Sequence, residues 1–465
     1  MKIQNIDCTD KLNQKVKLAG WVHARRDHGK IIFIDLRDRS GLVQVVFTPD
    51  KKKIYQEAQL LRPEYVVAIE GKVSRRPKGL ENPKIETGNV EVQADKLDIL
   101  ASAKTLPFEI TKDTKANAEE IRMKYRYLDL RSQRMQNILK LRHKVIKFIR
   151  DYLDEKGFWE IETPILTKST PEGARDYLVP SRPHKGKFYA LPQSPQQYKQ
   201  LLMVAGVEKY FQIARCFRDE DPRGDRQPEF TQLDLEMSFV TQDDILNLIE
   251  DLYIKMVKAV AQEKKITKIP FPRLSYDDVM KKYHSDKPDL RKSASGGKKD
   301  PNELAFAFII DWPQFFYNKD EKRWDPHHHI FTSPRKEDLP LLDKDPGKVR
   351  SWQHDLVLNG TEIAGGSIRI TDPLIQAKVL QLVGISKEEI KKRFGHMLTA
   401  FEYGVPPHGG IAPGIDRFVT ILSNETSIRE VIAFPKTGDG RDFMMDAPSD
   451  IDQKQLRELH LKIRD

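Results

Sequence analysis

Residues 217–230 read Phe217-Arg218-Asp219-Glu220-Asp221-Pro222-Arg223-Gly224-Asp225-Arg226-Gln227-Pro228-Glu229-Phe230, with three arginines and five acidic residues. An apolar run precedes them at 210–214, and alternating polar and apolar residues follow at 231–237. Two strand-like runs joined by a charged loop predict an antiparallel hairpin whose polar groups converge on a highly charged ligand. A solvated hairpin tip is the alternative. Exposed ion pairs contribute at most ~1 kcal/mol each, so this density of charge favours a binding site.

This hairpin resembles motif 2 of the class II aminoacyl-tRNA synthetases, and in detail that of the bacterial-type aspartyl-tRNA synthetases. Upstream, a long amphipathic helix is expected from about residue 136 to Gly157, followed by a strand over 158–166. This pair resembles motif 1, the dimer element of the family, although an ordinary core helix is the alternative. Residues 408–418 resemble motif 3, in which glycines allow close backbone approach. Three ordered motifs imply a homodimeric enzyme.

The composition limits the class of protein. The 465 residues are enough for two or three domains, and 79 Lys and Arg against 69 Asp and Glu leave a diffuse surplus of +10. The two cysteines, Cys8 and Cys216, cannot form a disulfide framework or a thiolate metal site, so a reducing compartment is expected. No apolar leader or membrane-length run occurs, which predicts a soluble cytoplasmic protein without a membrane partner.

The N-terminal region predicts a small β-barrel. Strands are expected at 16–22, 30–36, 41–47, 65–71 and 89–93, and a helix is expected at 51–61. Three strands, a helix and two strands is the order of an OB barrel. OB barrels bind sugars and proteins as well as nucleic acids, so the barrel alone does not identify a ligand.

The predicted fold class is therefore α+β, with a five-stranded OB barrel before a class II catalytic domain, an antiparallel sheet flanked by helices. The expected domains are an anticodon-binding barrel at 1–102, a hinge at 103–135 and the catalytic domain at 136–465. Bacterial aspartyl-tRNA synthetases usually carry a large insertion domain between motifs 2 and 3. Here the polar stretch 291–303 stands in its place as a short linker.

The chemistry that the resemblance implies is activation of an amino acid by ATP. A carboxylate attacks the α-phosphate while pyrophosphate leaves, so two anions must approach and the site needs fixed cations. By resemblance, Arg218 bridges the α-phosphate and the carboxylate, Phe230 lies under adenine, and Arg417 clamps its other face. Arg218, Glu362 and Arg417 are the expected catalytic residues. The implied ATP-binding residues are Arg218, Asp219, Glu220, Gln227, Phe230, Glu362, Gly414, Ile415, Asp416 and Arg417.

The resemblance also implies how L-aspartate is selected. Arg369 matches the arginine that relatives aim at the side-chain carboxylate, and Lys199 is its helper. Asparagine would leave both cations facing a neutral amide, a strong penalty in a desolvated pocket. The implied aspartate-binding residues are Glu172, Ser194, Gln196, Lys199, Arg218, Asp234, His328, His329 and Arg369.

Two clusters could hold a metal. Asp355 and Glu362 flank Asn359-Gly360, which predicts a tight hairpin, and by resemblance they hold the Mg²⁺ expected with ATP. As isolated acids they would be solvated. His327-His328-His329 invites a zinc interpretation. Three successive strand residues cannot face one metal, and no cysteine or fourth histidine lies at ligand spacing, so zinc is disfavoured.

The barrel carries the residues that relatives use to read the anticodon. Phe33 would stack on the central base, and Gln44 and Glu91 would bond base edges. A core position for Phe33 is the alternative. His28 favours relaxed specificity, in which tRNA-Asn is accepted beside tRNA-Asp. The implied anticodon residues are Arg26, His28, Phe33, Gln44 and Glu91.

The resemblance thus predicts ATP-dependent attachment of L-aspartate to tRNA-Asp through aspartyl-adenylate. An asparaginyl- or lysyl-tRNA synthetase is the nearest alternative, and residues 227–234 together with Arg369 favour aspartate. A tRNA-binding paralogue without catalysis is the alternative from another class. It would require a damaged site, yet Arg218, Glu362 and Arg417 are all present.

Overall fold

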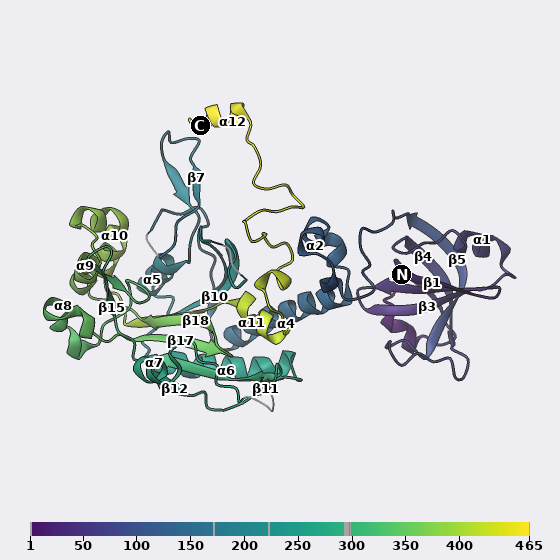
Figure 1. Ribbon diagram of the computed structural model, residues 1–465, viewed down its shortest axis with the longest axis horizontal. Coiled ribbons are helices and arrows are strands. Elements are labelled where there is room, and N and C mark those ends of the chain that lie inside the picture. Colours follow the sequence, from purple (N-terminus) through teal and green to yellow (C-terminus); the bar gives the residue numbers. More distant parts are fainter. Residues whose placement is uncertain (1, 171–172, 222–223, 293–296, 298, 465) are drawn as a thin grey trace. The chain divides into compact units, whose positions relative to one another are not determined.

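The computed structural model describes residues 2–170, 173–221, 224–292, 297 and 299–464. They form two compact units, divided between Asn117 and Ala118, and each is treated separately below (Figure 1). The predicted hinge at 103–135 spans this division. Its second half, 118–135, folds into the C-terminal unit, where Arg122 forms a buried ion pair with Glu430.

The N-terminal unit is a closed five-stranded barrel in the order β1-β2-β3-β5-β4, as the sequence predicted for an OB fold. Alternation sets the barrel wall: Ile32, Ile34 and Leu36 point into the core, whereas Phe33 between them is only half-buried. The elements are η1 (Ile6–Asp10), β1 (Lys15–His28), β2 (Ile31–Asp38), β3 (Gly41–Phe47), α1 (Lys52–Ala58), β4 (Val66–Arg75), β5 (Val90–Ala101) and η2 (Thr114–Ala116).

The C-terminal unit is built on an eight-stranded sheet in the order β12-β14-β17-β18-β19-β10-β9-β6. Its central pairs are antiparallel, as predicted, and only the edge pairs β12–β14 and β6–β9 are parallel. The strands are β6 (Trp159–Glu160), β9 (Lys209–Phe217), β10 (Glu229–Ser238), β12 (Arg273–Ser275), β14 (Phe306–Ile310), β17 (Gln353–Leu358), β18 (Thr361–Ile368) and β19 (His408–Pro413). The predicted hairpins β9–β10 and β17–β18 are both confirmed.

Helices cover this sheet, and α4, α6 and α11 share its main apolar core. Ser132 caps α4, whose Ile138, Val145 and Ile149 lie on the buried stripe. No helix of the described residues combines the length and the apolar character needed to cross a bilayer. The helices are α2 (Glu119–Lys124), α3 (Arg126–Asp129), α4 (Gln133–Glu155), α5 (Gln196–Val204), α6 (Gln242–Val260), α7 (Tyr276–Tyr283), α8 (Leu341–Lys344), α9 (Pro373–Leu382), α10 (Lys387–Phe401), α11 (Ile415–Leu422) and α12 (Gln453–Glu458), with short turns η3 (Lys336–Asp338), η4 (Pro346–Lys348) and η5 (Ile428–Glu430).

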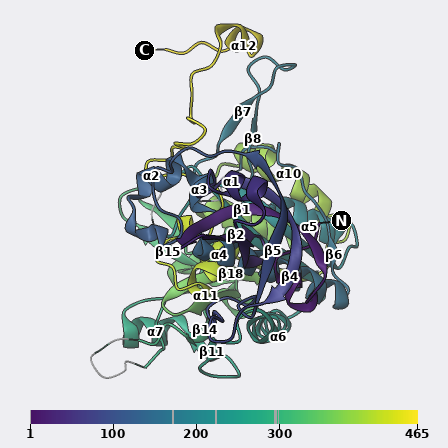
Figure 2. The same cartoon turned by 90° about the vertical axis from the view of Figure 1, so that its right-hand side faces the viewer.

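Three two-stranded sheets complete the unit. They pair β7 (Leu178–Pro180) with β8 (Phe188–Ala190), β11 (Lys265–Ile266) with β13 (Glu303–Leu304), and β15 (Phe315–Asn318) with β16 (Arg323–Pro326). Both views show the β7–β8 hairpin and α12 projecting from the same end of the unit (Figures 1 and 2).

Two predicted segments differ from the structure. The strand expected over 158–166 is only Trp159–Glu160, because just these residues pair with β9 and Pro164 has no N–H to continue a ladder. The segment expected as a linker at 291–303 ends in β13, and Asp289 holds both Arg291 and Lys299 in ion pairs across its described part. Its residues 293–296 and 298 lie outside the described chain.

A buried ion network joins the start of the C-terminal unit to η5. Arg122 and Arg134 each bind Glu430, at 2.8 and 2.9 Å. Burial raises the pKa of Glu430, but hydrogen bonds from the two arginines outweigh it and hold this pKa at about 2. Because the folded pKa lies below the unfolded value of roughly 4.3, the network stabilises the fold above that pH and loses its effect as the pH falls towards 2.

We therefore expect Glu430→Gln to lower the free energy of unfolding at pH 7 by about 3 kcal/mol, because the buried Arg122 and the half-buried Arg134 lose their shared anion. The same variant should lose less further stability than the parent between pH 5 and pH 3, since it has no carboxylate to protonate there. Urea unfolding at both pH values measures the two effects. Equal acid sensitivity in parent and variant would contradict the assignment.

Candidate active site

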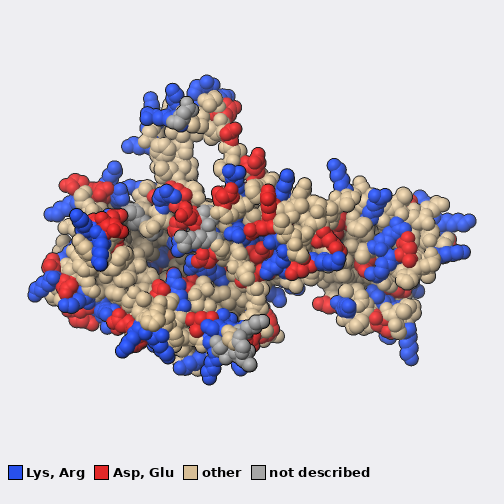
Figure 3. Space-filling view, viewed as in Figure 1, with Lys and Arg blue, Asp and Glu red and all other residues tan. Residues whose placement is uncertain are grey.

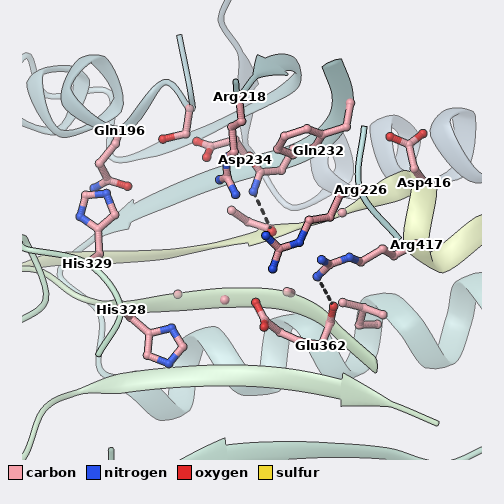
Figure 4. A pocket seen from close by; sticks show the side chains of 18 of the residues that line it. Gln196, Arg218, Arg226, Gln232, Asp234, His328, His329, Glu362, Asp416 and Arg417 are labelled. Atoms are coloured by element: carbon pink, nitrogen blue, oxygen red, sulfur yellow. Dashed lines mark hydrogen bonds between the residues drawn. The ribbon is translucent and has the colours of Figure 1, made fainter. Parts of the chain in front are cut away.

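One cavity of about 370 Å³ lies over the central strands of the C-terminal unit. It brings together residues that are far apart in the sequence: Gln196 from α5, Arg218 and Asp234 from the β9–β10 hairpin, Glu362 from β18 and Arg417 from α11 (Figure 4). Strand order explains this, because β10 is a neighbour of β19, and β19 of β18, although β10 precedes both in the sequence by more than a hundred residues.

The β9–β10 hairpin supplies the cavity's first arginine. Phe217 pairs with Glu229, so the charged loop leaves from the end of both strands. The guanidinium of Arg218 lies 5.0 Å from the centre of the Phe230 ring. Its Nε is buried and has no hydrogen-bond partner among the described residues. An unpaired buried donor of this kind is suited to an anionic ligand.

The opposite wall comes from β19 and α11. Arg417 donates from Nη1 to the backbone carbonyl of Glu362 at 2.7 Å, and its Nη2 lies 3.5 Å from Asp225 (Figure 4). Asp416, by contrast, is engaged by Arg142 and by the backbone N–H of Thr231, so it fixes the start of α11 against α4 and β10.

Close backbone approach in β19 requires glycine. A Cβ at Gly410 would lie 2.1 Å from both the Leu235 carbonyl oxygen and Glu236 Oε2. Residue 410 faces Glu236 directly in the β10–β19 pairing. The glycine therefore leaves room for a buried carboxylate between the strands.

That carboxylate is the centre of a buried ion network. Lys199 Nζ lies 3.0 Å from Asp234 and 3.2 Å from Glu236, and Arg369 Nε lies 2.9 Å from Glu236. All four side chains are at most 4% exposed. Burial raises the pKa of Glu236, but Arg369 and Lys199 outweigh it and hold this pKa at about 2, so Glu236 is ionised. Arg369 and Lys199 thus line the cavity as charge-compensated groups, not as the free cations that the sequence suggested.

The network nevertheless leaves groups for a ligand. Arg369 makes three hydrogen bonds, to Glu236 and Ser367, which leaves two of its five N–H groups. Lys199 has a third N–H, and Asp234 Oδ1 is buried without a partner among the described residues. The cavity therefore presents several donors and one carboxyl acceptor close together. Burial raises the pKa of this Asp234 carboxyl, and Lys199 opposes the shift.

His329 adds another donor. Burial first, and then the fields of Arg369, Lys199 and Arg218, lower the pKa of His329 to about 3, so its imidazole is neutral. Its Nδ1 accepts from the Phe331 N–H at 3.4 Å, which assigns the proton to Nε2. This buried Nε2 has no partner among the described residues. Burial likewise lowers the pKa of His328 to about 4. Both imidazoles are therefore neutral near pH 7.

Asp355 and Glu362 form the carboxylate pair at the other end of the cavity. A Cβ at Gly365 would lie 3.2 Å from Asp355 Oδ1 and 3.9 Å from Glu362 Oε1, so both carboxyl groups flank one backbone position. Burial and then Glu362 raise the pKa of Asp355. Two neighbouring carboxylates repel each other when both are ionised, and a divalent cation between them relieves this repulsion. Carboxylate oxygens are also ligands that Mg²⁺ prefers. His328 Nε2 lies 3.5 Å from Asp355, whereas the His327 ring packs on Phe316 with centres 5.2 Å apart, so the three histidines do not converge.

Most predicted residues line this single cavity. Of the ATP set, Asp219 and Ile415 are not among its lining residues, and Asp219 instead lies 3.4 Å from Arg175. Asp355 lies just behind the lining, and Glu172 lies outside the described residues. The lining residues from the predicted sets are Ser194, Gln196, Lys199, Arg218, Glu220, Gln227, Phe230, Asp234, His328, His329, Glu362, Arg369, Gly414, Asp416 and Arg417.

Sequence reasoning missed several members of the site. Glu236 follows Asp234 by two residues in a predicted strand, and this spacing places both carboxylates on one face. Arg226 lies in the charged loop, where the sequence indicated no role for it. In the structure it pairs with Glu220 at 2.8 Å and lines the cavity. No motif around Lys287 indicated a binding role. The residue lies in the segment before the linker and reaches the cavity only through the tertiary structure.

The barrel carries a second candidate site, in which Arg26 and His28 are exposed, Phe33 is half-buried, and Gln44 and Glu91 are buried. Strand pairing aligns Arg26 with Phe33, Asp35 with Gln44, and Gln44 with Glu91. Gln44 donates to Glu91 at 2.8 Å, and Arg26 binds Asp35 through two hydrogen bonds of 2.6 and 2.8 Å. Phe33 is half-buried beside this polar row and lies outside the barrel core, which removes the core alternative.

His28 is exposed and stands edge-on to the half-buried Phe33, with ring centres 6.3 Å apart. Lys and Arg side chains are spread over the visible surface of both units instead of forming one patch, in line with the diffuse positive charge of the sequence (Figure 3). Recognition by the barrel would therefore depend on this local row of polar and aromatic groups.

Comparison with known proteins identifies the family. The class II tRNA synthetases (D, K and N) match residues 118–438, and the OB-fold nucleic acid binding domain matches residues 16–100. The aspartate–tRNA(Asp/Asn) ligase of Rubrobacter xylanophilus is 46% identical over 97% of this chain and 95% of its own length. The aspartate–tRNA ligase of Staphylococcus carnosus is 42% identical over 98% of this chain and 97% of its own length.

Solved structures share the fold. The asparaginyl-tRNA synthetase of Pyrococcus horikoshii, in complex with asparaginyl-adenylate, superposes with a TM-score of 0.75 at 24% identity, over 94% of this chain and 98% of that one. The aspartyl-tRNA synthetase of Entamoeba histolytica gives 0.72 at 20% identity, over 94% and 91%.

The alignment with the Rubrobacter protein runs over 571 positions but covers 97% of the 465 residues, about 451, so about 120 of its positions have no counterpart here. That difference agrees with the short linker that the sequence predicted at 291–303 in place of the insertion domain of relatives. With its class II and OB-fold matches, this chain belongs to the bacterial-type aspartyl-tRNA synthetases and lacks their usual large insertion domain.

Proposed function

We propose that the chain attaches L-aspartate to tRNA in two steps, first forming aspartyl-adenylate from ATP with loss of pyrophosphate, and then transferring the aspartyl group to the terminal ribose of tRNA. The observation that supports this most directly is the common cavity of Arg218, Arg417 and Arg369. Fixed guanidinium groups at one end suit a triphosphate, and the donor-rich network at the other end suits a small diacid.

The role of each residue follows from the hydrogen-bonding groups that it has free for a ligand. Asp234 Oδ1 would accept from the α-ammonium group of aspartate, and Arg369, Lys199 and His329 would donate to its side-chain carboxylate. Arg218 would bind both the attacking α-carboxylate and the α-phosphate of ATP. This arrangement would orient the two anions and stabilise the charge that develops between them. Arg417 would bind the far side of the nucleotide.

Asp355 and Glu362 would hold Mg²⁺, which when bound neutralises charge on the triphosphate. Their shared position beside Gly365 fits a hard divalent cation.

Selection against asparagine would depend less on the net charge of the pocket than on its free hydrogen-bonding groups being donors. Because Glu236 and Asp234 compensate Arg369 and Lys199, the pocket is close to neutral, yet every free group expected around the side chain is a donor. A carboxylate accepts from all of them, whereas an amide brings its own N–H groups against donors and leaves them unpaired.

A direct test compares ATP–pyrophosphate exchange with aspartate, asparagine and lysine. Exchange that depends on aspartate, with asparagine and lysine at background, is the expected result. Preference for asparagine or lysine would assign the other members of the family, and no exchange with any of them despite tRNA binding would indicate the paralogue without catalysis.

We further propose that the acceptor is tRNA-Asp and, as a second acceptor, tRNA-Asn. Support comes from the exposed His28 beside Phe33 and from the several relatives that are aspartate–tRNA(Asp/Asn) ligases. Charging of both transcripts with aspartate is expected. Charging of tRNA-Asp without measurable charging of tRNA-Asn would overturn the relaxed specificity alone.

The remaining proposals concern assembly and compartment. Homodimerisation through α4 and β6 is supported by the exposure of Trp159 on the edge strand, 65% of its surface. A cytoplasmic location is supported by the two buried cysteines, neither of which forms a disulfide. Sedimentation of the purified protein tests the first proposal, and cell fractionation tests the second.

Replacing Phe33 by alanine is expected to raise the KM for tRNA about tenfold, because stacking of a base on an aromatic ring contributes roughly 1–3 kcal/mol. Aspartate-dependent ATP–pyrophosphate exchange should stay at the parent rate, since that step does not involve the barrel. Aminoacylation and exchange kinetics on the same preparation separate the two effects. An unchanged KM for tRNA would remove Phe33 from the anticodon site.

A further inference from the structure

Lys287 lines the active-site cavity, yet nothing in the proposed reaction uses it. Its Nζ lies 3.0 Å from Glu362 Oε2, and the two side chains are 41% and 27% exposed. Glu362 is also one of the two carboxylates that suit a divalent cation. A lysine ammonium therefore lies on the same carboxylate as the proposed metal, at Oε2, while Oε1 is the oxygen beside Gly365.

The backbone around Lys287 is tied to the turn that carries Glu362. At Gly360, in the β17–β18 turn, a Cβ would lie 3.2 Å from Asp289 Cβ and 3.8 Å from the Lys287 carbonyl oxygen. Asp289 is itself anchored, because it accepts from the Arg291 N–H at 3.1 Å and pairs with Lys299 at 2.9 Å. The fold thus holds the backbone of Lys287 beside the turn that precedes Glu362.

The cations around the Glu362 carboxylate determine how its ion pair with Lys287 would respond to ligands. Arg417 contacts the backbone carbonyl of Glu362 and not its carboxylate, so Lys287 is the only cation that the described residues place in an ion pair with that carboxylate. A divalent ion that arrives alone must compete with the ammonium for the charge of the same carboxylate. A triphosphate that arrives with the ion offers the displaced ammonium new oxygens within the same cavity.

We propose that Lys287 is a counter-cation built into the nucleotide site: it occupies Glu362 in the nucleotide-free enzyme, competes there with divalent cations, and moves to the triphosphate when nucleotide and metal bind together. The inference rests on the proposed function only in taking the nucleotide as ATP. Its consequence is positive coupling, because each of the two ligands removes an obstacle to the other.

The test measures binding without turnover. Free Mn²⁺ is counted by electron paramagnetic resonance during titration of the full-length protein, and ATP binding is measured by calorimetry with and without Mn²⁺. The variants are Lys287→Met, which removes the charge, and Lys287→Arg, which keeps it. Lys282→Met is the matched control, because Lys282 is an exposed lysine on α7 that lies over the Tyr283 ring.

Lys287→Met should bind Mn²⁺ about tenfold more tightly in the absence of nucleotide, since a positive charge close to the ion is gone. It should bind ATP without metal about tenfold more weakly, since a charge-assisted phosphate contact is lost. Lys287→Arg and Lys282→Met should both resemble the parent.

Mn²⁺ affinity that is unchanged or weaker in Lys287→Met would overturn the proposal, as would unchanged affinity for ATP. Circular dichroism checks that the variant is folded, and Lys287→Gln serves in its place if it is not. Failure of the parent to activate aspartate would refute the proposed function and leave these binding curves interpretable.

Discussion

Replacing Arg369 by glutamine should lower kcat/KM for aspartate in ATP–pyrophosphate exchange by about a thousandfold or more. The change removes the two N–H donors that remain for a substrate carboxylate, and a site built to bond a polar group penalises a lost partner heavily. Exchange kinetics with varied aspartate and saturating ATP measure the effect. A change of less than threefold would exclude Arg369 from aspartate binding.

The same substitution should also lower stability, by about 3 kcal/mol, because Glu236 stays ionised and buried while it loses one of its two cations. The double variant Arg369→Gln with Glu236→Gln provides the control. Removing both charges should restore part of the stability but none of the activity. Recovery of activity in the double variant would show that Arg369 only compensates Glu236 and does not bind the substrate.

Replacing Arg218 by glutamine should reduce kcat for ATP–pyrophosphate exchange by about a thousandfold, with a smaller effect on the KM for aspartate. Its charge is expected to act mainly in the transition state, where negative charge develops between the attacking carboxylate and the α-phosphate. Removal of a comparable group from other enzymes lowers kcat by roughly 10²–10³-fold. Arg218→Lys should recover only a small part, because lysine keeps the charge but not the planar pair of donors.

Arg215 offers a matched control for this experiment. It lies on β9 three residues before Arg218, its side chain is 43% exposed, and it pairs with Glu229 at the strand surface. Arg215→Gln should leave exchange within about threefold of the parent, since an exposed ion pair contributes at most ~1 kcal/mol. Equal losses in both variants would point to disruption of the hairpin and not to the chemistry.

Elements with strong local signals were predictable. The barrel strands follow the alternation of apolar residues, α4 follows its buried stripe, and Asn359-Gly360 sets the β17–β18 turn. At the turn, Asn359 and Gly360 both adopt positive φ, 52° and 83°, a conformation that this dipeptide tolerates well. Where the local signal was weak, the prediction was less accurate: the strand expected over 158–166 needed a partner along its whole length, and β9 pairs with only two of its residues.

The sequence by itself determined the order of the motifs, the residue types that a triphosphate and a diacid require, and the barrel that precedes them. Tertiary structure alone decided which charges are free. Arg369 and Glu236 are 133 positions apart and meet only because β18, β19 and β10 lie side by side, with Gly410 making room between them. Lys287 reaches Glu362 for the same kind of reason. The energy of a charge depends on its neighbours and its burial, and neither is a property of the local sequence.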